Sequence, residues 1–199
     1  MIGVVDYGAG NMQSLANALD HLGVAWRLAE SDADFAECDR VILPGVGHFQ
    51  SAMQTLVETG QYRRLAAFAE SGKPLFGICL GAQLLLESSE ESPGVDGLGL
   101  IPGAVVRLET ETVPHMGWNR VRPTGESPIF DAGERDAHYY FAHSYVCDPV
   151  SADHRLAVTQ CGTSEFCAAV GRGNVRGVQF HPEKSGAVGL QLLERFARC

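Results

Sequence analysis

The chain has 199 residues, 45% of them hydrophobic and 20% charged, which is ordinary for a globular protein and enough for one sizeable domain. The formal net charge of −9 argues against non-specific nucleic-acid binding, because phosphate contacts require clustered lysine and arginine. No apolar run approaches the ~20 residues of a membrane-spanning helix, and no secretion signal precedes the first predicted strand. We therefore expect a cytoplasmic protein.

The first half of the chain alternates predicted strands with predicted helices. Leu15, Leu19 and Leu22 recur at helical spacing, and Gly23 is a typical residue for the end of such a helix. Strands are expected at residues 1–5, 24–28, 40–43 and 75–78, and helices after Asn11, over about 61–69, and from just past Cys79 to about Glu87. Strands separated by helices indicate a parallel sheet covered on both faces.

The second half favours short strands, at residues 104–108, 139–146, 156–161, 166–172 and 175–180. Gly173-Asn174 between two apolar runs predicts a tight hairpin. A last helix is expected over residues 187–197. Since no linker or internal repeat is evident, we predict one α/β domain over residues 1–199. It would have a central, mainly parallel sheet with flanking helices and an antiparallel, strand-rich second half.

Six cysteines are present: Cys38, Cys79, Cys147, Cys161, Cys167 and Cys199. None lies in a Cys-x-x-Cys pair, so the sequence predicts no metal site. Without a secretion signal, free thiols are more usual than a disulfide framework. Five of the cysteines fit small hydrophobic or surface positions, and Cys79 is the exception.

Cys79 lies in a Gly-x-Cys-x-Gly segment, residues 77–81, between a predicted strand and a predicted helix. This is the thiol counterpart of the nucleophile elbow, in which small residues permit a strained turn that exposes the nucleophile. The helix N-terminus would favour a thiolate through its dipole and free N–H groups. In parallel sheets, sites gather at the carboxyl ends of strands, where this turn would lie. Taken alone, the segment also fits a buried cysteine beside glycines needed for packing.

A base is expected from Gln179-Phe180-His181-Pro182-Glu183, at the end of a predicted strand. A free thiol, with a pKa of ~8.5, needs a base at neutral pH, and the base needs a carboxylate to fix its tautomer. His181 and Glu183 would share a face if the chain stays extended, as Pro182 favours for His181. Cys79, His181 and Glu183 are therefore a candidate catalytic triad, although His-Pro-Glu alone is more often a surface turn.

Oxyanion donors are expected from Pro44-Gly45-Val46-Gly47, after the predicted strand 40–43. Acyl transfer needs N–H groups aimed at the developing oxyanion, and a glycine-flanked loop at a strand end can offer them. The candidates are the N–H groups of Val46, Gly47 and Leu80. Because two glycines flank Val46, the peptide between Gly45 and Val46 has unusual freedom to rotate, and we expect a resting loop that turns the Val46 N–H away.

These segments, in this order, resemble the triad-type (class I) glutamine amidotransferases. Further segments resemble the glutaminase subunits of imidazole glycerol phosphate synthases within that family. They are Asp-Tyr-Gly-Ala-Gly-Asn at 6–11, Gly-Leu-Gly-Leu-Ile-Pro-Gly at 97–103, Pro-His-Met-Gly-Trp-Asn at 114–119, Phe-Ala-His-Ser-Tyr at 141–145, and Gly-Val-Gln-Phe-His-Pro-Glu-Lys-Ser at 177–185. The motifs span nearly the whole chain, and Met-Gly-Trp-Asn is the most diagnostic.

The resemblance implies that glutamine is cleaved through a thioester on Cys79, without a cofactor. Ammonia would pass through a tunnel to a separate (β/α)₈-barrel cyclase subunit, which makes imidazole glycerol phosphate and an aminoimidazole-carboxamide ribonucleotide in histidine biosynthesis. Carried over by motif, the residues that hold glutamine would be Gly47, Gln83, Glu91, Ser144 and Tyr145. Those that face the partner would be Asn11, Trp118, Asn119, Tyr140 and Lys184.

Some positions allow other interpretations. Ala82 stands where the family usually has Met, which would loosen packing beside Cys79, and Thr112 stands where a basic residue is common, which would alter the partner contact. Tyr140 and Trp118 also fit buried packing positions, and Glu91 and Lys184 fit a solvated surface.

Three other functions fit parts of the pattern. The triad alone also fits a glutaminase that serves anthranilate or pyridoxal phosphate synthesis, but the segment 114–119 favours the histidine pathway. A catalytically silent regulatory subunit is a second alternative, against which the intact triad argues. A hydrolase or peptidase on a similar sheet is a third, and the pairing of His181 with Glu183 makes it less favoured.

Overall fold

The computed structural model describes residues 1–8, 12–110, 113–130 and 137–198, and it begins with the predicted alternation of strands and helices. The first strands are β1 (Ile2–Val4), β2 (Trp26–Leu28), β3 (Arg40–Leu43) and β4 (Leu75–Ile78). They lie parallel in the order β2-β1-β3-β4. The helices between them are α1 (Met12–His21), α2 (Asp32–Glu37), α3 (Phe49–Glu58) and α4 (Gln61–Glu70).

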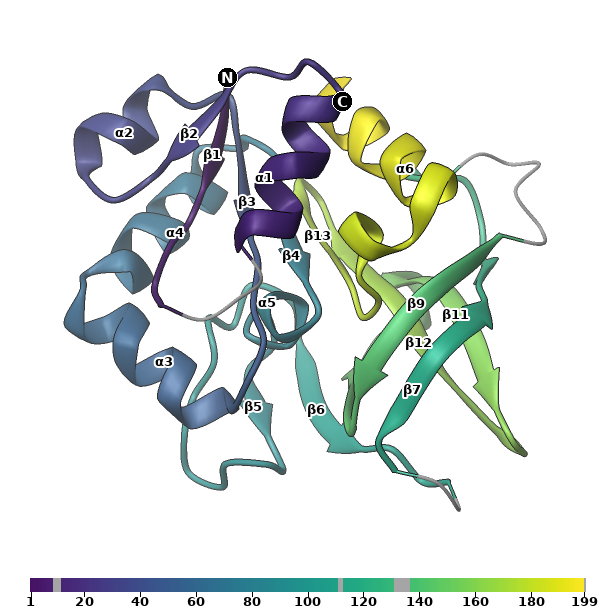
Figure 1. Cartoon of the computed structure of the whole chain (residues 1–199). Helices are drawn as coiled ribbons and strands as arrows, with labels where there is room; N and C mark the ends of the chain where they lie inside the picture. The colour runs from purple at the N-terminus through teal and green to yellow at the C-terminus, as the bar shows by residue number, and fades with distance from the viewer. Residues whose placement is uncertain (9–11, 111–112, 131–136, 199) are drawn as a thin grey trace.

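Alternate residues of these strands serve two cores, because successive side chains of a strand point to opposite faces. Val41 and Leu43 of β3 belong to the core that contains Phe35 of α2 and the buried residues of α3 and α4. Ile42 belongs to the other core, with the buried side chains of α1 and of α6 (Gly186–Arg198). Figure 1 shows α1 beside α6 on one side of the sheet and α3 and α4 on the other. Both faces are therefore covered, as predicted.

The second half extends this sheet with mainly antiparallel strands. The strand β13 (Val175–Val178) pairs parallel with β4, and the sheet continues through β12 (Ser164–Arg172), β10 (Tyr145–Pro149), β6 (Gly103–Arg107) and β5 (Ser88–Ser89). Beside β12 lie β11 (Arg155–Cys161) and then β8 (Arg122–Pro123), and a 3-10 turn, η1 (Ala152–His154), precedes β11. The predicted hairpin at Gly173-Asn174 joins β12 to β13. The predicted fold class is confirmed.

A separate antiparallel pair forms a second, two-stranded sheet, which Figure 1 draws in front of β11 and β12. It consists of β7 (His115–Arg120) and β9 (His138–His143). The single strand predicted over 139–146 is therefore wrong, because the chain changes sheets at Ser144: β9 ends at His143 and β10 begins at Tyr145. This crossing brings Ser144 and Tyr145 to the edge of the nucleophile pocket described below.

The helix predicted from Cys79 to about Glu87 is also wrong in extent, because α5 (Leu80–Gln83) has only four residues. Past Gln83 the N–H groups of Leu85 and Leu86 bond carbonyl oxygens only three residues back, and the N–H of Glu87 donates to the carbonyl oxygen of Gly103, so the α-helical pattern ends. The carbonyl groups of residues 84–87 accept hydrogen bonds from the backbone of residues 97–101. Gly97 permits this contact, since a Cβ atom there would lie 2.1 Å from the carbonyl oxygen of Leu86.

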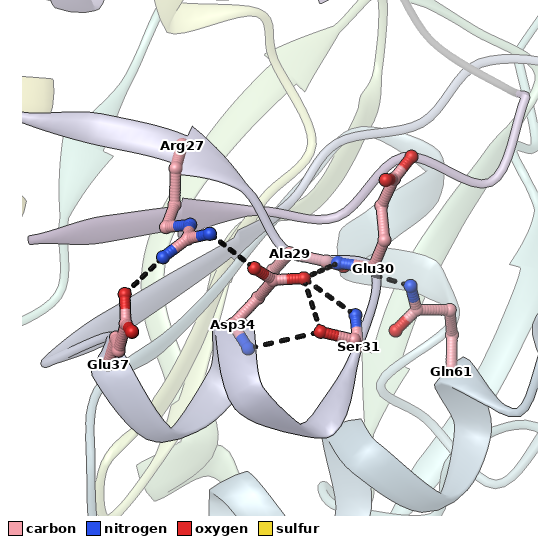
Figure 2. Close-up of polar contacts among 7 residues, drawn as sticks. All are labelled: Arg27, Ala29, Glu30, Ser31, Asp34, Glu37 and Gln61. Atoms are coloured by element: carbon pink, nitrogen blue, oxygen red, sulfur yellow. Dashed lines mark hydrogen bonds and ion pairs between the residues drawn. The ribbon is translucent and has the colours of Figure 1, made fainter.

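The helix α2 begins with a capping box that the sequence analysis missed (Figure 2). The hydroxyl of Ser31 accepts a hydrogen bond from the N–H of Asp34 at 3.3 Å, and the Asp34 carboxylate accepts one from the N–H of Ser31 at 2.8 Å. Arg27 of β2 pairs with Asp34, and Gln61 of α4 donates to the carbonyl oxygen of Ala29 at 2.9 Å. These contacts fix the corner between β2 and α2 against α4.

No helix in the described ranges is both long enough and apolar enough to cross a membrane.

Candidate active site

Cys79 lies on the sharp turn between β4 and α5, with backbone angles φ 55° and ψ −109°. Two glycines make this turn possible. A Cβ atom at Gly81 would lie 1.8 Å from the carbonyl oxygen of Leu43, and one at Gly77 would lie 2.6 Å from the backbone nitrogen of Ala82. The strained turn has the geometry of a nucleophile elbow, and strain of this kind is common at functional sites.

The helix behind Cys79 contributes less than the sequence suggested. With four residues, α5 makes about one turn, so its dipole is much weaker than that of a longer helix. A thiolate at Cys79 must therefore be stabilised mainly by neighbouring hydrogen-bond donors.

His181 interacts with both Cys79 and Glu183, but His181 and Glu183 do not meet along an extended chain as predicted. His181 has extended backbone angles, and the next residues form a 3-10 turn, η2 (Pro182–Lys184). That turn brings Glu183 back, so that His181 Nδ1 and Glu183 Oε1 are 2.8 Å apart. Both side chains are 3% exposed. The other ring nitrogen, Nε2, is not engaged by Glu183 and is left for the interaction of His181 with the Cys79 side chain.

Opposing effects act on the His181 ring. Burial lowers its pKa, whereas the hydrogen bonds and charges of Cys79 and Glu183 raise it, and the balance raises the pKa to about 9. His181 therefore retains a proton taken from the thiol, which is what a base paired with a thiolate must do.

The other described cysteines lack such a base. Burial raises the pKa of Cys38 and of Cys147, and it raises the pKa of Cys167 to about 12. Cys161 is half-buried, and Cys199 lies outside the described residues. The five cysteines that the structure describes are all free thiols. Of these five, Cys79 is the one placed for nucleophilic chemistry.

A pocket of about 340 Å³, which we call the nucleophile pocket, opens at Cys79. It brings together the following predicted site residues: Val46, Gly47, Cys79, Leu80, Gln83, Glu91, Ser144 and Tyr145. Its wall also contains Pro114, Met116, Ala142 and His143, to which the sequence analysis gave no role although they lie in quoted motifs. A larger hollow of about 420 Å³ lies over β6, β10 and β12, but no triad residue lines it.

Neighbouring groups fix the orientation of two predicted glutamine-binding residues. Nε2 of Gln83 donates to the carbonyl oxygen of Tyr145 at 2.9 Å and to Oε1 of Gln179 at 3.1 Å, so Oε1 is the group that Gln83 can offer to a ligand. Oε2 of Glu91 accepts from the N–H of Phe49, the first residue of α3, at 2.8 Å. Glu91 is therefore anchored at the pocket rather than extended into solvent.

His143 is a neutral member of the pocket wall. A carbonyl oxygen can only accept, so His143 Nδ1 donates to Tyr145 at 3.0 Å, and its Nε2 accepts from His115 Nδ1 at 3.2 Å. Burial, with smaller effects from His115 and His181, lowers the pKa of His143 to about 3. Asn119 donates to His115 Nε2 at 3.2 Å, which completes a chain of hydrogen bonds from β7 to the pocket.

The loop that carries the predicted oxyanion donors is closed. The N–H of Leu80 donates to the carbonyl oxygen of Gly45 at 3.3 Å. In a trans peptide the next N–H points away from that carbonyl group, so the Val46 N–H is directed away from Leu80. Tyr7 lies against the same loop, because its hydroxyl donates to the carbonyl oxygen of Pro44 at 2.9 Å. A Cβ atom at Gly45 would lie 2.4 Å from the Tyr7 hydroxyl oxygen, so this position has room only for glycine.

Three predicted partner-facing residues lie together on the surface. Trp118 is 58% exposed, so its interpretation as a buried side chain is wrong. Its ring centroid lies 6.3 Å from that of Tyr140 across the pair of β7 and β9, and Nζ of Lys184 lies 6.0 Å from the Tyr140 ring. Asn119 instead uses its side chain to bond Gln160 and His115. Asn11 and Thr112 lie outside the described residues.

Ala82 is fully buried. A Cβ atom at Gly177 would lie 2.7 Å from the Ala82 Cβ, so Ala82 packs closely against β13. Looser packing beside Cys79, expected from the departure from Met, stays a prediction.

The elbow, the buried pair of His181 and Glu183, and the pocket at the carboxyl end of β4 define a class, the class-I glutamine amidotransferases. The family model described as Glutamine amidotransferase class-I matches residues 3–198. A solved structure described as a glutamine amidotransferase aligns over 98% of both chains with a TM-score of 0.77 and 22% identity, which shows the fold alone.

Curated relatives identify one family within this class. The imidazole glycerol phosphate synthase subunit HisH of Chlorobium luteolum is 41% identical over 100% of both chains, and that of Geobacillus thermodenitrificans is 46% identical over 98% of this chain and 94% of its own. The chain therefore belongs to the HisH family. The chloroplastic imidazole glycerol phosphate synthase hisHF of Arabidopsis thaliana is 45% identical over 98% of this chain, which spans only 34% of that longer protein.

Proposed function

We propose that the chain cleaves glutamine to glutamate and ammonia through a thioester on Cys79, and that the ammonia serves a cyclase in imidazole glycerol phosphate synthesis. The chain is a glutaminase by family, whereas the roles of its residues are our assignment. The observation that carries this assignment is the buried pair of His181 and Glu183, which interacts with Cys79 where the nucleophile pocket opens.

The first half-reaction forms the thioester. His181 Nε2 takes the thiol proton, and the sulfur of Cys79 attacks the side-chain carbonyl carbon of glutamine. Glu183 holds His181 Nδ1 and stabilises the imidazolium. His181 then returns the proton to the leaving nitrogen, so that ammonia departs and the acyl group remains on sulfur. In the second half-reaction, His181 removes a proton from water, which attacks the thioester and releases glutamate.

Glutamine would be held by Gly47, Gln83, Glu91, Ser144 and Tyr145. The carboxylate of Glu91 suits the α-ammonium group, since opposite charges attract and one of its oxygens already anchors it to α3. Oε1 of Gln83 suits a donor of the ligand. The lining of the pocket supports these roles, because all of these residues border it.

The partner would be a (β/α)₈-barrel cyclase subunit, and ammonia would reach it through a tunnel. The relatives are named as subunits of a synthase, which supports a complex. The surface cluster of exposed Trp118, half-buried Tyr140 and exposed Lys184 is our candidate for part of the contact surface, because aromatic side chains are enriched at interfaces. Asn11 and Asn119 stay predicted members of this surface, and the cytoplasm stays the predicted location.

The closed loop makes the isolated chain a poor glutaminase in this proposal. While the Leu80 N–H is bonded to Gly45, neither it nor the Val46 N–H is available to an oxyanion. Rotation of the peptide between Gly45 and Val46 would release the Leu80 N–H from Gly45 and direct the Val46 N–H towards the oxyanion. Partner and acceptor nucleotide would favour the rotated loop, which requires only that they bind its two states with different affinities.

We expect the kcat of glutamine hydrolysis to rise at least ~10²-fold when the cyclase subunit and its nucleotide ligand are added, because one missing oxyanion donor costs ~10²–10³ in rate. The KM should change less, since these donors act in the transition state. Steady-state ammonia release from the isolated chain, the complex and the ligand-loaded complex measures both constants.

The controls for this experiment separate the alternatives. An isolated chain that already turns over at the rate of the loaded complex would contradict the gating but leave the triad intact. If a synthase of the anthranilate or pyridoxal phosphate pathway stimulated hydrolysis and the cyclase did not, that synthase would be the partner. Absence of hydrolysis in every mixture would indicate the silent regulatory subunit.

A further inference from the structure

Gln179 is buried beside the nucleophile, and the mechanism above gives it no role. Its side chain is 1% exposed, and its Nε2 lies 3.7 Å from the sulfur of Cys79. Its backbone N–H donates to the carbonyl oxygen of Ala168 at 2.9 Å, so the residue is held in line with β13. The amide therefore approaches the sulfur from a fixed position in the sheet.

The amide of Gln179 can present only one end to the sulfur. The carbonyl oxygen of Tyr145 can only accept, so Gln83 must direct its NH₂ group towards it. The same NH₂ group lies 3.1 Å from the side-chain oxygen of Gln179, which accepts from it. The remaining end of Gln179, its NH₂ group, then faces Cys79. The donor is oriented by buried neighbours before glutamine binds.

We propose that Gln179 is a further catalytic residue, whose side-chain N–H donates to the sulfur of Cys79 and stabilises the thiolate that attacks glutamine. The proposal rests on the proposed function of the same site. The one-turn helix α5 has a weak dipole and stabilises a thiolate at Cys79 only slightly. The fixed amide of Gln179 supplies a directed hydrogen-bond donor in addition. His181 takes the proton, and Gln179 stabilises the charge that remains on sulfur.

The other titratable groups around the sulfur stay the same when Gln179 is changed. In the described part of the chain they are His181 after β13, Tyr7 after β1 and Cys147 of β10. A change in thiol reactivity after substitution of Gln179 therefore reports on the amide itself.

The test is the rate at which iodoacetamide alkylates Cys79 near neutral pH in Gln179→Leu and Gln179→Glu, resolved by peptide mass spectrometry. The thiolate is the reactive form, so loss of a donor should slow alkylation about tenfold in both variants. The glutamate variant keeps the size of the side chain and an oxygen for Gln83, but it places an acceptor against the sulfur. Half-buried Cys161, alkylated in the same sample, is the internal reference.

The matched control is Gln61→Leu, which removes another buried glutamine, 2% exposed, that donates to Ala29 in the corner of α2 and α4. It should leave the alkylation of Cys79 at the parental rate. Alkylation as fast as in the parent, or faster, in either Gln179 variant would overturn the proposal, because a residue that only fills space exposes the thiol when it is changed. Alkylation needs no glutamine, so a parent that released no ammonia would contradict the proposed function alone.

Discussion

Replacement of Cys79 with serine should lower glutamine hydrolysis by at least ~10³-fold while the protein stays folded. The change is nearly isosteric and local, but an alcohol gives up its proton far less readily than a thiol, and His181 is paired with sulfur. Ammonia release by the complex measures the loss, and circular dichroism checks the fold.

Cys161→Ser is the matched control. This half-buried thiol in β11 lies 3.8 Å from the hydroxyl oxygen of Thr110 and outside the nucleophile pocket, so its replacement should leave hydrolysis at the parental rate. Parental activity in Cys79→Ser would show that Cys79 is not the nucleophile. A large loss in Cys161→Ser would show that the wrong cysteine had been selected.

His181→Ala should be nearly as damaging as Cys79→Ser, because the members of a triad act as one unit. Glu183→Gln should be milder, since an amide oxygen can still accept from His181 Nδ1 but no longer carries the charge that stabilises imidazolium. The kcat/KM values of the two variants rank these effects. A greater loss in Glu183→Gln than in His181→Ala would reverse the roles that we assign.

The His181→Ala variant also checks the electrostatics of the pair. The pKa of His181 is raised to about 9 in the folded chain, against ~6.5 for an unperturbed histidine. The folded state therefore gains a proton-linked stability of at most ~3 kcal/mol, complete below about pH 6.5 and lost as the pH rises through about 9. Urea unfolding should show this decline in the parent and a weaker one in His181→Ala. An equal decline in both would contradict the raised pKa.

The parts of the site that follow from local chemistry could be predicted from the sequence. Gly77 and Gly81 indicate the elbow because their lack of Cβ atoms is what the turn requires, and the structure shows the clashes that any side chain would cause. The alternation of strands and helices likewise predicts the parallel sheet, because burial on both faces leaves apolar strands between amphipathic helices. The motifs, taken in their order along the chain, also predicted residues that line the nucleophile pocket.

The parts that depend on distant backbone contacts could not be predicted. The backbone that follows α5 bonds to residues 97–103, which are distant in the sequence, and helical periodicity gives no sign of these contacts. The change of sheet at Ser144 lies within an apolar run that reads as one strand. His143 and Gln179 lie in quoted motifs, but their roles depend on which end of each side chain a neighbour engages, and that is visible only in three dimensions.

The central claim is that glutamine is attacked by Cys79, and covalent trapping tests it most directly. A glutamine analogue with an electrophilic carbon in place of the side-chain amide should attach to one residue, Cys79, and ammonia release should fall in proportion to the modified fraction. Excess glutamine should slow the labelling, because both ligands occupy the nucleophile pocket. Peptide mass spectrometry locates the label. Attachment to another cysteine, or undiminished ammonia release from protein fully modified at Cys79, would contradict the account.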